Sequence, residues 1–194
     1  MTGPGGSRRR ACSAYAPLVV GGAAWVFAAV AGDGAGDGTA RFYISEVIWL
    51  GAQAALLVGM VALWRSRPHG EATAGDVGFA TAGLGRAAFV GAEVAALATG
   101  ATQEALLPIA ALLTAVGMVV AGVAVVRARE WEGWHRIPLL AAGAYPFLAM
   151  FPFAAAADDG PPALTLGAWG LAFVALGVAT QAEARRMSDV VAHP

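Results

Sequence analysis

The sequence predicts an all-α protein, a polytopic transmembrane bundle of six membrane-spanning helices with both termini in the cytoplasm. Three observations support this fold class. Hydrophobic residues make up 58% of the chain and charged residues only 13%, about half the charged share of a soluble domain. Six apolar runs have roughly the 20 residues that a helix needs to cross a bilayer. The arginines, finally, gather on one side of the runs.

The six runs cover residues 14–31, 43–64, 77–99, 104–126, 137–157 and 163–182. The segments between them are rich in glycine, proline and charge, such as GDGAGDGTAR before the second run and DDGPP before the sixth. These compositions are typical of short loops. We therefore expect a cytoplasmic tail over 1–13, a transmembrane domain over 14–182 and a second cytoplasmic tail over 183–194.

The first run has two interpretations. Arginines at 8–10 precede it, and the small residues at 29–31 resemble a signal-peptidase site, so the run could be a cleaved signal peptide. However, it is longer than the usual apolar region of about 7–15 residues in such signals, and it contains Trp25. A retained helix is favoured, while cleavage would leave five spans.

The orientation is predicted from the twelve arginines, since the chain has no lysine. Cytoplasmic loops retain positive charge. Ten arginines fall on one side if both termini are cytoplasmic: Arg8, Arg9, Arg10, Arg65, Arg67, Arg127, Arg129, Arg136, Arg185 and Arg186. Only Arg41 falls on the other side, together with Asp33, Asp37, Asp158 and Asp159. We expect both ends of the chain to face the cytoplasm.

Tryptophans flank these charges, as is typical at headgroup depth. Trp64 precedes Arg65, and Trp131 and Trp134 lie within the segment 127–136. This segment is either a short amphipathic turn on the inner membrane surface or a plain connecting loop with aromatic anchors.

Four polar side chains lie inside predicted spans: Glu46 and Gln53 in the second, Arg86 and Glu93 in the third. A charge at the centre of a membrane helix costs about 2.5–3.5 kcal/mol on insertion scales, so it normally faces protein or water and is paired. Arg86 is too deep to reach either surface easily. These residues therefore need a structural or a functional explanation.

Their spacing predicts two layers. Glu46 and Gln53 are seven residues apart, as are Arg86 and Glu93, and two helical turns return to nearly the same face. In antiparallel spans, Glu46 level with Glu93 places Gln53 level with Arg86. With this register the two acids share an outer layer, and one of them should carry a proton unless Arg86 or water lies between them; Arg86 could also lean toward Glu93. Such a network could lock the helices together or serve a proton-coupled carrier.

The fifth span contains a predicted helix break at Pro146, which removes a backbone donor and displaces the carbonyl of Ala142. Tyr145 lies beside the break at about the depth of Arg86. The freed carbonyl can be buried in protein or face a polar cavity, so Tyr145 is either a packing residue or part of a polar path.

Small residues predict close helix packing. They recur at Gly78, Ala82 and Gly85 in the third span and at Gly117 and Ala121 in the fourth. Such residues let membrane helices approach where no hydrophobic effect drives their association.

Catalytic and metal-binding motifs are missing from the sequence. It has neither a phosphate-binding P-loop nor an H-E-x-x-H zinc motif, no histidine lies inside a span, and Cys12 is the only cysteine. The glycine-rich acidic loop at 32–38 lacks the ligand spacing of an EF-hand. We expect no enzymatic activity, no metal and no cofactor, and the scattered arginines do not indicate nucleic-acid binding.

Two classes of function remain. The first is a non-enzymatic membrane subunit or scaffold, whose partner is another membrane protein or a second copy of the chain. The second is a small permease or channel with a polar path lined by Glu46, Gln53, Arg86, Glu93 and Tyr145. The bias toward alanine, glycine and arginine resembles that of bacterial membrane proteins from GC-rich genomes, which implies a multi-pass protein of the bacterial plasma membrane.

Overall fold

The structure is a computed structural model that describes residues 5–32, 36–156 and 162–192. All regular secondary structure in these ranges is helical, which confirms the predicted all-α class. The elements are α1 (Gly5–Ala31), α2 (Ala40–Arg65), α3 (Thr73–Thr99), α4 (Leu106–Ala128), η1 (Gly133–Arg136), α5 (Ile137–Tyr145), η2 (Pro146–Met150), α6 (Phe151–Ala156) and α7 (Ala163–Ala192). Each predicted apolar run overlaps one helix of the structure, except that the fifth run is divided among α5, η2 and α6.

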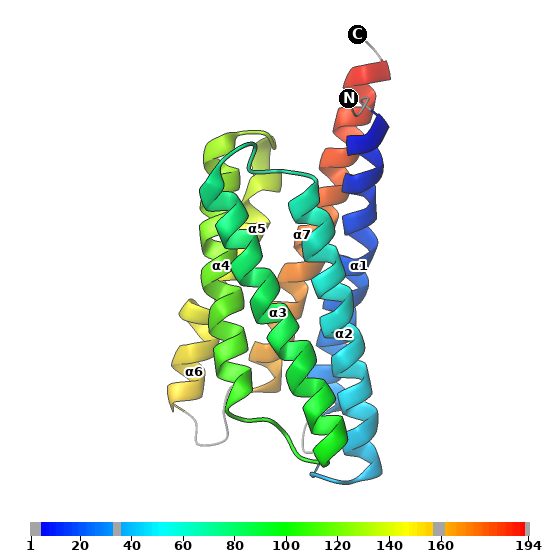
Figure 1. Cartoon of the computed structure of the whole chain (residues 1–194), viewed down its shortest axis with the longest axis vertical. Helices are drawn as coiled ribbons and strands as arrows, with labels where there is room; N and C mark the ends of the chain where they lie inside the picture. Colours follow the sequence, from blue (N-terminus) through cyan, green and yellow to red (C-terminus); the bar gives the residue numbers. More distant parts are fainter. Residues whose placement is uncertain (1–4, 33–35, 157–161, 193–194) are drawn as a thin grey trace.

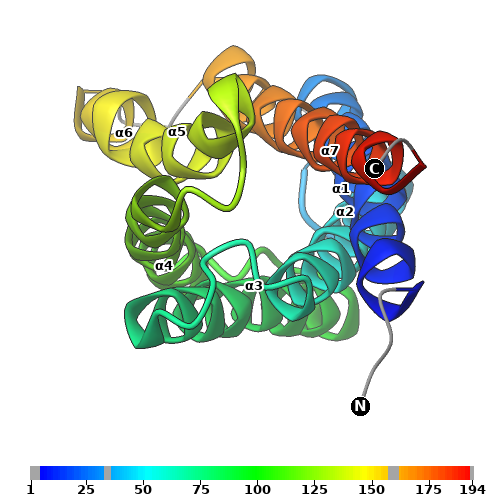
Figure 2. The ribbon, with the colours of Figure 1, turned by 90° about the horizontal axis from the view of Figure 1, so that it is seen from above.

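The helices form a closed ring in chain order (Figure 2). Helix α1 packs on α2, α2 on α3, α3 on α4, α4 on α5, and α5 on α7, which returns to α1. The first and last helices are therefore neighbours, although they lie far apart in the sequence. Side chains from both can meet residues of α2 and α3 inside the ring.

Four helical stretches in the described residues are long and apolar enough to cross a membrane: Ala40–Arg65, Leu106–Ala128, Gly133–Ala156 and Ala163–Met187. The apolar stretch of α1 is shorter, Tyr15–Ala31, and α3 carries Arg86 and Glu93. Large apolar side chains are exposed on the outside, for example Leu148 at 79% and Leu164 at 84%. These features fit a membrane-embedded protein.

The beginning of α1 and the end of α7 lie at one end of the bundle (Figure 1). The α2–α3 and α4–η1 connections lie at that same end. Most of the arginines that we predict to be cytoplasmic belong to these segments. The described parts of the two predicted tails continue the helices, since α1 begins at Gly5 and α7 ends at Ala192. Asp33, Asp158 and Asp159 lie outside the described residues.

Close packing by small residues is confirmed between α3 and α4. A Cβ atom added at Gly78 would lie 2.4 Å from the backbone nitrogen of Ala121, and one at Gly117 would lie 2.3 Å from that of Ala82. At Gly85 it would lie 2.5 Å from the nitrogen of Thr114. Larger side chains at these positions would push the two helices apart.

The 127–136 segment corrects one prediction about the tryptophans. Arg129 adopts a left-handed conformation (φ 57°) that ends α4, and η1 then leads into α5. Trp131 consequently turns into the bundle and is only 6% exposed, whereas Trp134 is 51% exposed. Trp134 keeps the exposure expected of an interfacial anchor, and Trp131 instead belongs to the core.

Candidate functional site

The candidate site is centred on Arg86, whose side chain is completely buried inside the ring. Its Nη1 donates a hydrogen bond of 2.8 Å to Oε1 of Gln53 on α2. The antiparallel register of the two helices predicts this pairing. This hydrogen bond connects α3 to α2, the two helices that carry the buried polar residues predicted from the sequence.

Four aromatic rings surround the guanidinium group. Its Cζ atom lies 4.3 Å from the ring centroid of Phe173, 4.8 Å from Trp169, 5.2 Å from Trp25 and 5.5 Å from Phe89. A cation within about 6 Å of such rings is attracted by their quadrupoles, most strongly where water is excluded. These contacts offset part of the cost of burying the charge. We call these four residues, with Arg86 and Gln53, the Arg86 cage.

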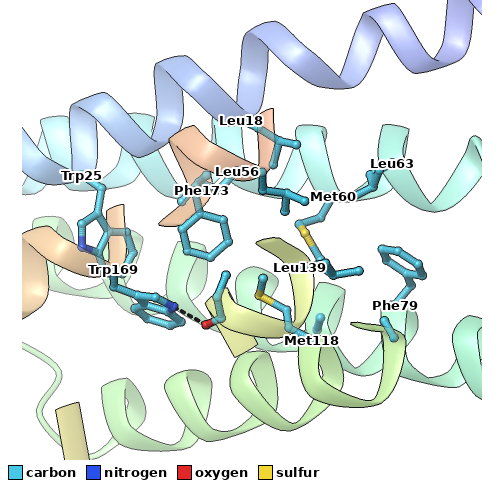
Figure 3. Close-up of a cluster of buried hydrophobic side chains, with 14 of the residues drawn as sticks. Leu18, Trp25, Leu56, Met60, Leu63, Phe79, Met118, Leu139, Trp169 and Phe173 are labelled. Atoms are coloured by element: carbon cyan, nitrogen blue, oxygen red, sulfur yellow. Dashed lines mark hydrogen bonds between the residues drawn. The ribbon is translucent and has the colours of Figure 1, made fainter. Parts of the chain in front are cut away.

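The two indole groups of the cage are held in place by their own hydrogen bonds. The Nε1–H of Trp25 donates to the carbonyl oxygen of Leu166 at 2.8 Å. The Nε1–H of Trp169 donates to the carbonyl oxygen of Ala142 at 2.9 Å (Figure 3). The two rings also pack edge to face, with centroids 5.1 Å apart. Hence α1, α5 and α7 fix the rings that contact the cation on α3.

The Ala142 bond explains how Pro146 is tolerated. Pro146 cannot donate to the Ala142 carbonyl, and the chain passes from α5 into the π-helix η2 at this point. Trp169 supplies the missing donor from α7. The chain thus stays helical through Pro146 as a π-helical turn in place of the predicted break, and the freed carbonyl of Ala142 is satisfied inside the protein.

Tyr145 does not join the cage. Its hydroxyl group donates to the carbonyl oxygen of Thr165 at 2.9 Å and so connects α5 to the beginning of α7. No hydrogen bond or cation–π contact between Tyr145 and Arg86 occurs in the described part of the chain. A polar path shared by Tyr145 and Arg86 therefore stays a prediction.

Glu46 and Glu93 form a second layer about two helical turns from the first. Both residues are nearly buried, at 8% and 7% exposed. That their carboxyl groups share a proton stays a prediction.

Arg86 does not lean toward Glu93, contrary to the prediction. No ion pair involving Arg86 occurs among the described residues, and its Nε and Nη2 atoms have no hydrogen-bond partner there. The reason is that the aromatic rings and Gln53 already surround the guanidinium in its own layer. The cation is held by rings and an amide and not by a carboxylate.

Two polar clusters at the arginine-rich end were not predicted. Nδ1 of His135 lies 2.9 Å from Glu183, whose other oxygen accepts from Arg186. Arg186 also pairs with Glu132 at 3.0 Å. The spacing of Glu183 and Arg186, three residues apart on one helix, was the available signal. The cluster joins the end of α7 to the α4–α5 connection.

The second cluster joins the α2–α3 connection to α3. Oδ1 of Asp76 accepts from the indole of Trp64 at 2.6 Å and lies 3.1 Å from Nε2 of His69. The hydrogen bond from Trp64 is the main cause that lowers the pKa of Asp76 below its usual value. His69 is completely buried, although the sequence only places it in a loop.

Comparison with known proteins gives no functional assignment: no family model, no curated protein and no solved structure matches the chain at a significant level.

Proposed function

We propose that the chain is a six-span protein of the bacterial plasma membrane with both termini in the cytoplasm. The arginines of the connections support this orientation because cytoplasmic loops retain positive charge, and these connections lie at the end of the bundle where α1 begins and α7 ends (Figure 1). Helices α1 and α3 complete the six spans. The apolar stretch of α1 is shorter than that of the other spans, and α3 carries buried charges. Neighbouring helices of the ring cover both features.

Reporter fusions at Gly36, Gly70, Gly133 and Gly160 test this topology. The first and last should report a periplasmic position, and the two middle ones a cytoplasmic position. The opposite pattern, or equal signals from all four fusions, would refute the proposed orientation.

Within that membrane, we propose a non-enzymatic role as a subunit or scaffold with a fixed polar interior. The observation that supports this role is the enclosure of Arg86. Groups from α1, α2, α3 and α7 contact one buried cation, so the cation fixes the relative positions of four helices. Fixed helix positions also fix the outer surface of the bundle. A membrane subunit presents such a surface to another membrane protein or to a second copy of the chain.

The second candidate is a small proton-coupled permease, and the Glu46–Glu93 layer favours it. Buried carboxyl groups inside a membrane are typical of proton relays, and Glu46 and Glu93 are only 8% and 7% exposed. Proton flux into proteoliposomes that contain the purified protein separates the two candidates. The subunit role predicts the same flux as in empty vesicles. A flux present in the wild type and lost in Glu93→Gln would favour the permease.

A further inference from the structure

A groove on the outside of the bundle lies between the beginning of α3 and the arginine-rich end of α4. Its volume is about 680 Å³. Val119, Val120 and Val123 of α4 form its apolar wall, while Arg127, Glu130 and Glu71 lie at its mouth. The groove thus combines an apolar wall with a charged rim, and the rim lies at the arginine-rich end of α4.

The apolar wall continues along the outward face of α4. Ile109, Leu113, Val116 and Val120 recur at helical spacing on this face and are 56%, 36%, 41% and 36% exposed. Arg127 follows Val120 by seven residues and so lies on nearly the same face. From Val116 to Arg127 the helix rises about 16 Å, roughly half of a 30 Å hydrocarbon core. One acyl chain of a single leaflet fits this length.

The rim carries charges of both signs. Arg127 supplies one cation, and the carboxylates of Glu71 and Glu130 supply two anions. Glu130 reaches across to the α2–α3 connection: a Cβ atom at Gly70 would lie 3.5 Å from its Oε1. A phospholipid with only a negative headgroup would meet two like charges here. A headgroup with a phosphate and an ammonium group matches all three side chains.

We propose that this groove binds one aminophospholipid, of the phosphatidylethanolamine type, from the cytoplasmic leaflet. The phosphate pairs with Arg127, the ammonium group is held near Glu71 and Glu130, and an acyl chain lies along the valines of α4. This inference rests on the proposed membrane topology. It goes beyond that proposal by assigning a specific lipid to one place on the surface.

Native mass spectrometry of the full-length protein, stripped of lipid in detergent, tests the proposal. Phosphatidylethanolamine should bind with a stoichiometry of one and more tightly than phosphatidylglycerol or phosphatidylcholine. Arg127→Gln should weaken this binding about tenfold, as expected for the loss of a charge-assisted hydrogen bond. Arg129→Gln is the matched control, because Arg129 is an exposed arginine two residues away that does not line the groove.

A second variant tests the apolar wall. Val123→Trp should fill the groove and reduce phosphatidylethanolamine binding, while Val126→Trp, outside the groove, should not. Tighter binding of phosphatidylglycerol, equal binding of all three lipids, or equal losses in Arg127→Gln and Arg129→Gln would overturn the proposal. These results leave the topology standing, since the reporter fusions measure it separately.

Discussion

The indole N–H of Trp169 on α7 donates to the carbonyl oxygen of Ala142 on α5, at 2.9 Å. The acceptor is the carbonyl that Pro146 leaves without its helical donor. The same ring lies 4.8 Å from the guanidinium of Arg86. One side chain thus satisfies the carbonyl that Pro146 frees and contacts the buried cation, which couples two irregular features of the interior.

Replacing Trp169 by phenylalanine should destabilise the protein by about 1–3 kcal/mol, because the buried Ala142 carbonyl loses its partner. The midpoint of thermal unfolding in detergent measures this loss. In a Pro146→Ala background the loss should be smaller, since residue 146 then has an N–H that can reach Ala142. Trp134→Phe, at a half-exposed position, serves as the control. Equal losses in the two backgrounds would contradict this role of Trp169.

The Arg86–Gln53 contact should behave as a coupled pair. Gln53→Leu removes the only hydrogen bond that the described residues offer to the guanidinium, which should cost about 1.5–3 kcal/mol. In an Arg86→Met background the same change should cost much less, because no buried cation remains. Glu93→Leu should combine additively with Arg86→Met, since these two residues form no ion pair. Additive losses for the Gln53 and Arg86 changes would show that the pair is not coupled.

Asp76 should make stability depend on pH at the acid end. The hydrogen bond from Trp64, helped by His69, lowers its folded pKa below the usual 3.8. Its contribution is therefore complete above that value and is lost as the pH falls through the lower folded pKa. The unfolding midpoint of Asp76→Asn should fall less steeply below pH 4 than that of the wild type. Asp189→Asn, at an exposed site, should follow the wild-type curve.

The small residues between α3 and α4 can be tested with two alanine substitutions. Gly78→Ala brings a Cβ atom to 2.4 Å from the backbone of Ala121, so the helices must separate, at a cost of about 1–3 kcal/mol. At Gly83 a Cβ atom meets nothing within 4 Å. Gly83→Ala should instead stabilise the helix by about 0.5–1 kcal/mol. A gain in stability for both variants would contradict the close packing.

The sequence predicts the polar layers because they depend on two adjacent helices. The seven-residue spacing fixes which face carries Gln53 and which carries Arg86, and a short connection makes α2 and α3 antiparallel neighbours. The aromatic cage is not predictable in this way. Trp25, Trp169 and Phe173 come from helices that meet only because α7 closes the ring against α1. A single sequence contains no signal for that closure.

The burial of a side chain is similarly hard to predict where the chain reverses its direction. Trp131 and Trp134 are three residues apart and equally close to arginines, yet one is buried and the other is half exposed. The difference depends on the left-handed turn at Arg129. Arginine is not a residue type that marks such a turn.

The central claim is that Arg86 is enclosed by protein and has no access to water. Thiol labelling of Gln53→Cys in a Cys12→Ser background, with a membrane-impermeant maleimide added to either side, tests it most directly. Gly36→Cys, in an exposed connection, provides the positive control. We predict that position 36 is labelled and that position 53 reacts only after denaturation in SDS. Labelling of position 53 at the rate of position 36 would show a water-filled path to Arg86 and contradict this account.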